Sequence, residues 1–331
     1  MEILNIIGGS GFIGTRLVHR LIGNQLREVK IIDKAPSKAF PSLAKFCDVR
    51  SIEQLRASIS EGSIIINLAA EHRDDVRPLS LYDEVNVAGA KNICTIAKKK
   101  NVQKIIFTST VAVYGFAPIG TDESGEIAPF NDYGRTKYEA EQVFKAWQAE
   151  APLERVLVII RPTVVFGEQN RGNVYNLLRQ IASGRFIMIG CGKNRKSIAY
   201  VENVAAFIEY SMGFNPGIHI YNFIDKPDLT MNGLVAHVNK LLGRTVEIKF
   251  RIPTFLGLLI GSCFDLVAKF TGKKFSISSI RVKKFCANSV YESATGSTGF
   301  VPPVPLMDAI EKTVRFEFIE DHKNEQVFYS E

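Results

Sequence analysis

Four glycines stand within seven positions directly after the first apolar run of the chain. Residues 3–7 are followed by Gly8-Gly9-Ser10-Gly11-Phe12-Ile13-Gly14. Glycine costs conformational entropy, and it is useful where the backbone needs a positive φ or a close neighbour. Between a strand and a helix, such a turn can hold the phosphates of a dinucleotide. The alternative is a tight turn that binds nothing.

Short β-branched runs alternate with helical patterns through the first half of the chain. The pattern predicts strands at 3–7, 29–32, 64–66, 104–107 and 156–160, and helices at 12–23, 52–59, 81–99 and 133–149. Alternating elements with unbroken apolar strands predict an α/β fold with a Rossmann-like doubly wound parallel sheet. A ligand of such a sheet binds beyond the carboxyl ends of the strands.

The pattern becomes less regular after Arg161. It predicts helices at 174–183, 200–210, 229–242, 253–270 and 306–318, a strand at 218–223 and a loop at 185–195. These elements predict a smaller, interleaved α/β C-terminal substrate lobe. We expect residues 1–165 to form the dinucleotide-binding domain, with 197–225 returning to it, and 166–331 to form the substrate lobe.

Composition excludes several classes of protein. The 331 residues are 46% apolar and 23% charged, as in soluble globular proteins. We expect no signal peptide, because apolar residues run from Ile3 directly into Gly8. The most apolar segment, 253–270, is interrupted by Asp265 and Lys269, so we expect no stable membrane insertion.

Charge and cysteine content point to a cytoplasmic protein without metal. The net charge of +7 comes from basic residues scattered along the chain. Because they form no basic stripe interleaved with aromatic residues, we expect no nucleic-acid binding. A modest positive field suits an enzyme with an anionic substrate. The five cysteines form no CxxC pair, which favours a reducing compartment, and the histidines do not cluster at ligand spacing.

An acidic residue ends the second predicted strand. Asp33 stands nineteen residues after Gly14, where a carboxylate accepts the adenosine ribose hydroxyls of a dinucleotide. The same carboxylate repels a 2′-phosphate, which favours NAD over NADP, although Lys34 and Lys38 lie nearby.

Two further strand ends complete the predicted cofactor cleft. Asp48-Val49 places a carboxylate near the adenine amino group, or forms an ordinary turn before a helix. Asn67-Leu68-Ala69-Ala70 ends the next strand with small side chains that allow the pyrophosphate to approach.

Hydroxyl groups and a YxxxK pattern mark the predicted chemical centre. Phe107-Thr108-Ser109-Thr110 closes a strand, and Tyr133 and Lys137 share one face of the following helix. A buried ammonium and an oxidised nicotinamide stabilise a phenolate; lowering its pKa to near neutrality takes about 4 kcal/mol. Tyr133 then serves as the general base of an alcohol oxidation, with Thr110 holding the same hydroxyl. The alternative is an amphipathic helix with a core tyrosine.

These motifs together resemble the extended short-chain dehydrogenase/reductases of the NAD-dependent epimerase/dehydratase family. The likeness runs through GGSGFIG, NLAA, TSTVAVYG, YGRTK, RPTVVFG, SIAYVENVA and TGFVPP, nearly the whole chain. It implies that Thr110, Tyr133 and Lys137 are catalytic and that the C-terminal lobe holds a nucleotide-activated sugar. Pattern and resemblance place the cofactor beside Gly8, Gly11, Phe12, Ile13, Gly14, Asp33, Lys34, Asp48, Val49, Leu68, Ala69, Ala70, Asn86, Thr108, Tyr133, Lys137, Arg161, Pro162 and Val164.

Departures from the family pattern narrow the expected reaction. Sugar 4,6-dehydratases carry an acidic pair after the catalytic threonine, where this chain has Val111-Ala112, so dehydration is not expected. Val164 stands where typical UDP-galactose 4-epimerases have a substrate-binding asparagine. An epimerase and a 4-keto-sugar reductase remain, and Asp33 favours the epimerase because epimerases recycle a bound NAD.

The expected substrate is a UDP-type sugar, epimerised at C4 through a transient 4-keto intermediate in surface polysaccharide precursor synthesis. Arg195 and Lys196 are expected to bind its diphosphate and Asn173 a phosphate or uracil, unless this segment is a solvated basic loop. The chain also resembles, more distantly, steroid-type alcohol dehydrogenases, and a non-catalytic NAD sensor is a further alternative. Relatives form homodimers through the helices at 81–99 and 133–149.

A lipid-linked substrate is the remaining alternative. It would use the apolar side chains of the helix at 253–270 as an exposed face, although such a stripe more often packs as a lid or against a second subunit. The residues in question are Phe255, Leu256, Leu258, Leu259 and Phe264.

Overall fold

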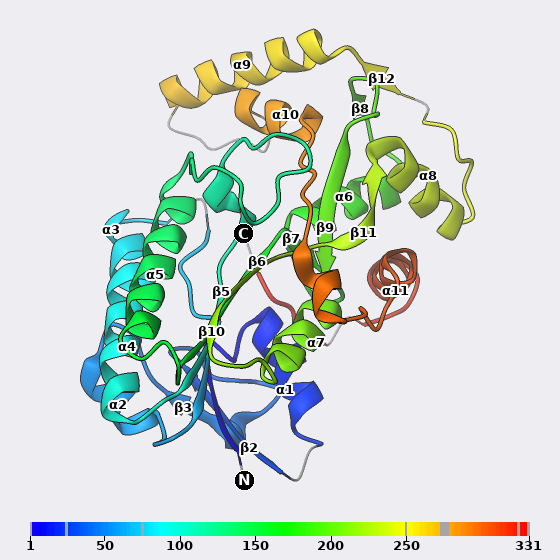
Figure 1. Cartoon of the computed structure of the whole chain (residues 1–331). Coiled ribbons are helices and arrows are strands. Elements are labelled where there is room, and N and C mark those ends of the chain that lie inside the picture. The colour runs from blue at the N-terminus through cyan, green and yellow to red at the C-terminus, as the bar shows by residue number, and fades with distance from the viewer. Residues whose placement is uncertain are drawn as a thin grey trace.

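A seven-stranded parallel sheet forms the larger part of the molecule (Figure 1). The computed structural model describes residues 2–23, 26–73, 76–248, 250–271, 278–322 and 325–329. The strand order is β10-β6-β5-β4-β1-β2-β3, and every neighbouring pair runs parallel. The strands are β1 (Glu2–Ile7), β2 (Arg27–Asp33), β3 (Ala44–Phe46), β4 (Ile64–Asn67), β5 (Lys104–Thr108), β6 (Val156–Pro162) and β10 (Gly217–Phe223).

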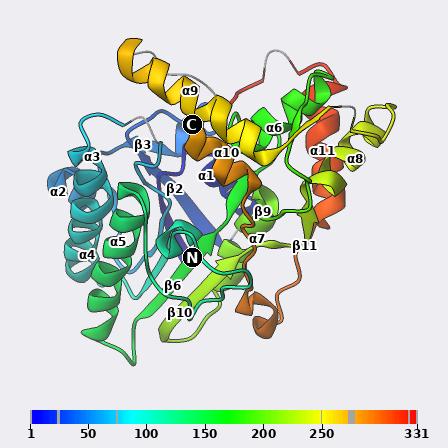
Figure 2. The same ribbon diagram turned by 90° about the horizontal axis from the view of Figure 1, so that it is seen from above.

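Helices cover both faces of this sheet. On one face lie α2 (Ile52–Ser58), α4 (Gly89–Lys99) and α5 (Asp132–Ala149), which share a core with Phe107, Phe144 and Trp147. On the other face α1 (Phe12–Leu21) packs against α7 (Val201–Ser211). Figure 2 shows the sheet between these two layers. The predicted doubly wound α/β fold is confirmed.

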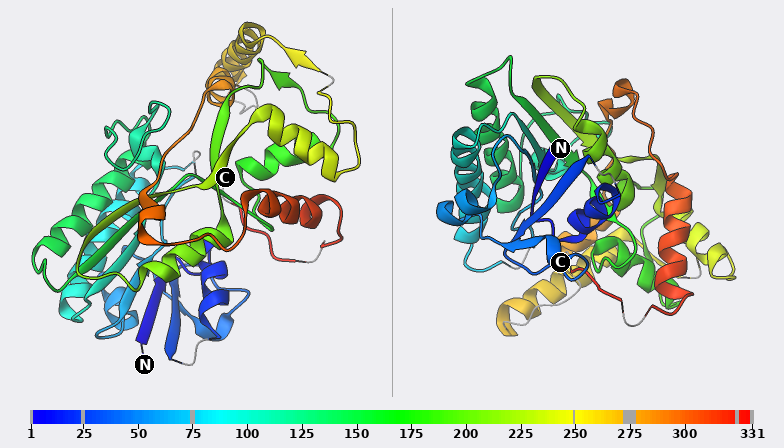
Figure 3. Two further views of the ribbon diagram at one scale, coloured as in Figure 1. Left: turned by 45° about the vertical axis from the view of Figure 1, so that its right-hand side comes forward. Right: turned by 90° about the horizontal axis from the view of Figure 1, so that it is seen from below.

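The remaining elements form a second lobe with its own core (Figure 3). Its sheets are β11-β9-β7 and β12-β8. The strands are β7 (Val164–Phe166), β8 (Met188–Ile189), β9 (Arg195–Tyr200), β11 (Asp225–Thr230) and β12 (Arg251–Ile252). The helices are α6 (Asn173–Ala182), α8 (Met231–Leu241), α9 (Thr254–Thr271), α10 (Ser279–Cys286) and α11 (Leu306–Phe318). The chain leaves this lobe after β9 and returns to the large sheet at α7 and β10.

Several elements differ from the sequence-based expectation. The single helix expected at 81–99 is α3 (Ser80–Tyr82), a π-helical stretch at Asp83–Ala88 and then α4. The helix expected at 229–242 begins after β11, where the Thr230 side chain accepts a hydrogen bond from Gly233 N. The loop expected at 185–195 contains β8. These segments have polar or mixed composition. Their secondary structure therefore depends on contacts with residues distant in the sequence rather than on the local pattern.

The helix α9 stands apart from both cores. Among the described residues it is the one helix whose length and composition would allow it to cross a membrane, with a mean hydropathy of 1.5. The sequence analysis used Asp265 and Lys269 to argue against membrane insertion. These two residues do not lower the mean hydropathy of α9 enough to exclude a membrane-spanning helix by composition. Only 11% of that 18-residue window is buried.

Candidate active site

The predicted site residues follow strands that end at the same level of the sheet. Ile7 of β1 is in register with Asn67 of β4, Asn67 with Phe107 of β5, and Phe107 with Ile159 of β6. The glycine turn, the small residues after β4 and the hydroxyl groups after β5 therefore meet at one edge. This is the edge at which a doubly wound sheet binds its ligand.

The glycine turn leaves no room for side chains. Gly8 has φ +78°, and a Cβ there would lie 2.6 Å from Ala69 N. A Cβ on Gly14 would lie 2.5 Å from Gly9 Cα. Gly11 precedes α1, and no side chain caps that helix. Its N-terminal N–H groups and dipole thus suit an anionic group at this position.

Asp33 ends β2 beside this turn. Its Oδ2 accepts a hydrogen bond from Ser10 N at 3.0 Å, and its Oδ1 accepts one from Ala35 N at 2.9 Å. The carboxylate is thereby fixed next to the glycine turn. Lys34 points to Glu71, with 3.8 Å between Nζ and Oε2.

The residues expected around adenine lie after β3. Asp48 pairs with Arg50 at 2.7 Å, and this hydrogen bond holds the pKa of the Asp48 carboxyl below its usual range. Val49 is buried against Gly89, where a Cβ would lie 2.9 Å from Val49 Cγ2. The Asp48 carboxylate therefore already has a cationic partner, which an adenine amino group would have to share.

The end of β5 supplies the hydroxyl groups. The Thr108 hydroxyl is buried and has no hydrogen-bond partner within the described residues. Thr110 accepts a hydrogen bond from Ala112 N at 3.1 Å, and the interaction of its side chain with the Tyr133 phenol acts to lower the pKa of that phenol. An unsatisfied buried hydroxyl beside the predicted cofactor cleft fits a site that a polar ligand completes.

Tyr133 and Lys137 lie one turn apart on α5, at this same edge. Burial raises the pKa of Tyr133 to about 12, against the opposing effect of the Thr110 hydrogen bond. Lys137 is 2% exposed, its Nζ lies 4.2 Å from the centre of the Phe107 ring, and burial lowers its pKa to about 7. The protein alone therefore does not lower the phenol pKa as the YxxxK pattern suggests.

Two residues assigned to the cofactor are held in buried networks. Asn86 accepts from Glu71 N and donates to the Glu71 carbonyl and to Thr136 Oγ1. Arg161 donates to Glu141 from Nε at 2.9 Å and from a terminal nitrogen at 2.6 Å. Both side chains fix α5 in place, because Thr136 and Glu141 belong to that helix. Two further residues assigned to the cofactor follow Arg161. Pro162 ends β6, and Val164 in β7 is partly exposed.

His72 is a member of the site that the sequence reasoning missed. It follows the small residues after β4, in the segment assigned to the cofactor, and its side chain is exposed to solvent. The signal in the sequence was its position two residues after Ala70, in the segment already assigned to the cofactor.

The expected substrate residues lie in the second lobe. Lys196 is largely enclosed: its Nζ donates to the Lys284 carbonyl at 2.7 Å, and burial lowers its pKa to about 8. Arg195, the preceding residue of β9, is exposed. Asn173 is exposed at the start of α6. Lys196 is therefore not part of a solvated basic loop, although Arg195 is exposed to solvent.

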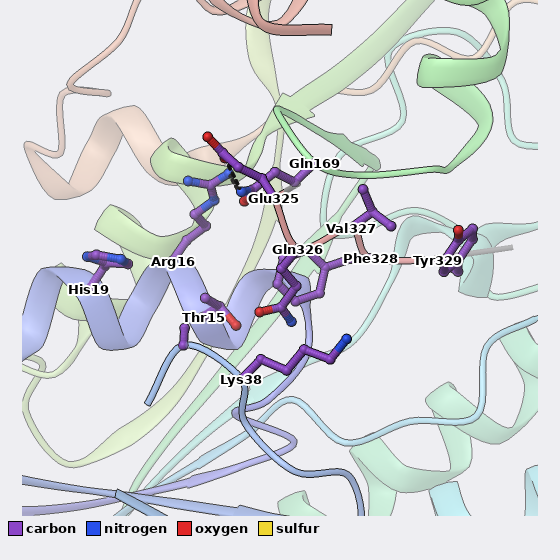
Figure 4. A pocket seen from close by; sticks show the side chains of 11 residues that line it. Thr15, Arg16, His19, Lys38, Gln169, Glu325, Gln326, Val327, Phe328 and Tyr329 are labelled. Carbon is purple, nitrogen blue, oxygen red and sulfur yellow. Dashed lines mark hydrogen bonds between the residues drawn. The ribbon is translucent and has the colours of Figure 1, made fainter. Parts of the chain in front are cut away.

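A pocket of about 900 Å³ lies between α1 and the C-terminal segment, residues 325–329 (Figure 4). Arg16 and His19 line it from α1, and Lys38 lines it from the segment after β2. Phe328 lines it too and packs against Phe12, with ring centres 5.7 Å apart. The C-terminal segment thus lies against the first residue of α1, at the border of the predicted cofactor cleft.

Taken together, the residues at the sheet edge fit NAD. The close-packed glycines, the uncapped helix, the fixed Asp33 carboxylate and the unsatisfied Thr108 hydroxyl are what a dinucleotide requires. The residue roles remain predictions.

Comparison with known proteins identifies the family. Residues 4–222 match the model of the NAD dependent epimerase/dehydratase family. The chain is 46% identical, over 98% of both sequences, to the N-acetyl-alpha-D-glucosaminyl-diphospho-ditrans,octacis-undecaprenol 4-epimerase of Escherichia coli O157:H7. It is 27% identical to the UDP-glucose 4-epimerase of Vibrio cholerae, over 81% of this chain and 84% of that one.

Solved structures have the same fold. The UDP-glucuronic acid 4-epimerase from Bacillus cereus in complex with NAD matches with a TM-score of 0.72 at 18% identity, over 95% of this chain and 98% of that chain. The expected enzyme class and the expected cofactor, NAD, are confirmed. The chain belongs to the NAD-dependent epimerase/dehydratase family.

Proposed function

We propose that this enzyme inverts C4 of an N-acetylglucosamine unit that is linked through diphosphate to a polyprenol. The observation that carries the proposal is the 46% identity, over 98% of both chains, to the undecaprenol-linked 4-epimerase. That relative is a 4-epimerase, which favours epimerisation over the 4-keto reductase that the sequence left open.

The chemistry assigned to this chain rests on α5 and the end of β5. Thr110 orients the C4 hydroxyl, and Tyr133, hydrogen-bonded to Thr110, takes the hydroxyl proton. NAD, held by the glycine turn and Asp33, would supply the acceptor and donor of the C4 hydride and, in its oxidised form, a positive charge near the phenol. The resulting 4-keto sugar turns over in the site, and Tyr133 gives the proton back after hydride reaches the opposite face. Lys137, in its charged ammonium form, stabilises the Tyr133 phenolate.

Within the second lobe, Lys196 is the candidate diphosphate ligand. A diphosphate is common to both possible carriers, a uridine nucleotide and a polyprenol. An ammonium that is partly desolvated, as the lowered pKa of Lys196 shows, gains more from a nearby anion than a solvated lysine does. Arg195, the preceding residue of β9, is exposed and starts from the opposite face of the strand, so Lys196 is the main candidate and Arg195 contributes only if its long side chain reaches around the strand end.

A UDP-sugar 4-epimerase is the second candidate, favoured by the 27% identity to the UDP-glucose 4-epimerase. One experiment separates the two. Purified enzyme is given undecaprenyl-diphospho-N-acetylglucosamine in detergent or, separately, UDP-N-acetylglucosamine, and the released sugars are separated by chromatography. We expect N-acetylgalactosamine from the lipid-linked substrate. Turnover of the UDP-sugar with an inert lipid-linked sugar would establish the second candidate instead.

The expected location and assembly belong to the same proposal. We propose that the enzyme works at the cytoplasmic side of the membrane without spanning it, as a homodimer paired through α4 and α5. All five cysteines are free, which suits a reducing compartment. Sedimentation of the purified protein measures the assembly.

A further inference from the structure

The outer face of α9 is apolar and exposed. Phe255 is 72% exposed and Phe270 81%. At 100° per residue, the exposed apolar residues and one cysteine fall within an arc of about 140°. They are Phe255, Leu256, Leu259, Ile260, Cys263, Leu266, Val267 and Phe270.

The opposite face of α9 is fitted to α10. A Cβ on Gly257 would lie 2.6 Å from Ile189 Cγ2, and one on Gly261 would lie 2.7 Å from Ser279 N. Asp265 Oδ2 accepts a hydrogen bond from Ser279 N at 3.0 Å, at the first turn of α10. Gly257 lets α9 approach β8 and Gly261 lets it approach α10, so α9 already packs on the protein through its other face. Figures 1 and 3 show α9 as the outermost element, lying along α10.

The segment that contains this helix is basic. Asp265 is the one acidic residue in the sequence of residues 250–290, and it accepts a hydrogen bond from Ser279 of α10. Lys269 lies in the last turn of α9, and the neighbouring elements carry further described basic residues: Arg251, Arg281, Lys283 and Lys284. An apolar helix face in a basic segment is typical of a helix that lies in the interface of an anionic membrane.

The α9–α10 pair also adjoins the candidate active site. Lys284 Nζ of α10 lies 4.9 Å from the centre of the Phe130 ring, three residues before Tyr133. The Lys284 carbonyl accepts the hydrogen bond from Lys196, the candidate diphosphate ligand. Phe130 in turn stacks on exposed Phe116, with ring centres 4.8 Å apart. The apolar helix is therefore one helix away from the diphosphate position.

We propose that the outer face of α9 docks on an anionic lipid bilayer and so brings the active site to a membrane-borne substrate. The helix lies on the bilayer rather than across it. Before α9, β12 pairs with β8, and after it α10 contacts the same strand, so both ends of α9 stay on one side. The purpose of the docking rests on the proposed function, but the docking itself needs no substrate.

Vesicle flotation tests the docking directly. Wild-type protein is mixed with vesicles of phosphatidylethanolamine and phosphatidylglycerol, or with phosphatidylcholine vesicles, and floated through a density gradient. We expect flotation with the anionic vesicles that weakens as salt is raised. Phe255→Ser/Leu259→Ser/Phe270→Ser should lower the partition by about a hundredfold, because three apolar side chains no longer enter the interface.

The control replaces equally exposed apolar residues elsewhere, as Leu153→Ser/Val301→Ser/Ile319→Ser, and should float like the wild type. Undiminished flotation of the α9 variant overturns the proposal. The proposal is also overturned if the wild type does not float and the α9 variant is a monomer where the wild type is a dimer. The outer face of α9 would then be the contact between two copies of the chain.

Activity separates this proposal from the proposed function. On a short-chain, water-soluble polyprenyl-diphospho-N-acetylglucosamine, the α9 variant should keep wild-type turnover. On undecaprenyl-diphospho-N-acetylglucosamine in anionic vesicles it should lose at least about tenfold. Equal turnover of the vesicle substrate by both proteins contradicts the docking, whereas no turnover of either substrate by the wild type contradicts the proposed function.

Discussion

The helices α5 and α9 are both 18 residues long, and each departs from the usual relation between polarity and burial: α5 buries two charged side chains beside its aromatic core residues, and α9 exposes most of its apolar side chains. Lys137 and Glu141 of α5 are 2% and 0% exposed. The residues that α9 buries are two glycines, while its large apolar side chains face outward. Burying charge and exposing hydrocarbon both cost free energy, so each points to a requirement other than stability. For α5 it is the predicted proton transfer, and for α9 the proposed bilayer.

The largest expected effect tests the chemical role of α5. Tyr133→Phe removes the hydroxyl that exchanges a proton with the substrate, and we expect turnover to fall by about a thousandfold. The packing of the ring is kept, so NAD released on denaturation should equal that of the wild type. Turnover within a few fold of wild type would remove Tyr133 from the mechanism.

The buried ion pair that fixes α5 comes next. Glu141→Ala leaves the Arg161 guanidinium buried without its carboxylate, and should lower the free energy of unfolding by about 3–5 kcal/mol. Urea denaturation measures this. The matched control is Glu311→Ala, which breaks the exposed pair with Arg315 and should change the free energy by no more than about 0.5 kcal/mol. Similar losses in the two variants would refute the contrast.

The wild-type protein, with Lys137, should be less stable than a variant with a neutral residue at that position. Its pKa is lowered to about 7 in the folded state, so the unfolded chain binds the proton more tightly between pH 7 and its ordinary value near 10. Stability therefore rises with pH across that window. At pH 7, Lys137→Met should raise the free energy of unfolding by on the order of 2 kcal/mol, and therefore the unfolding temperature, and it should lose activity.

The advantage of Lys137→Met should shrink toward pH 10, which thermal melts at several pH values would show. An advantage that is constant with pH would mean that packing, not the buried charge, distinguishes the two proteins.

The smallest effect is expected in α9. Phe255→Ala should change the free energy of unfolding by no more than about 0.5 kcal/mol, because that side chain lies mostly in solvent. Phe144→Ala in α5 is the control, and should cost about 3–5 kcal/mol because Phe144 is fully buried. A loss of several kcal/mol from Phe255→Ala in urea denaturation would show that α9 is covered in solution, contradicting an exposed docking face.

Much of the NAD-binding half was determined by local sequence. Its strands are continuous apolar runs, and its turns are punctuated by glycine and aspartate, so fold class, family and cofactor followed from short motifs. The positions of Thr110 and Tyr133 at one sheet edge also followed, because parallel strands align their carboxyl ends.

Tertiary structure decided what those side chains meet. Arg161 was expected at the cofactor, but its side chain donates two hydrogen bonds to Glu141, a residue twenty positions away on another element, and one to the Tyr114 hydroxyl. Asn86 was also expected at the cofactor, but its side chain is held by the Glu71 backbone and by Thr136 of α5. The sequence also did not determine which side of α9 is exposed, because the same apolar run can be buried or exposed. In the structure, Gly257 and Gly261 pack against neighbouring residues, and the large apolar side chains therefore face the solvent.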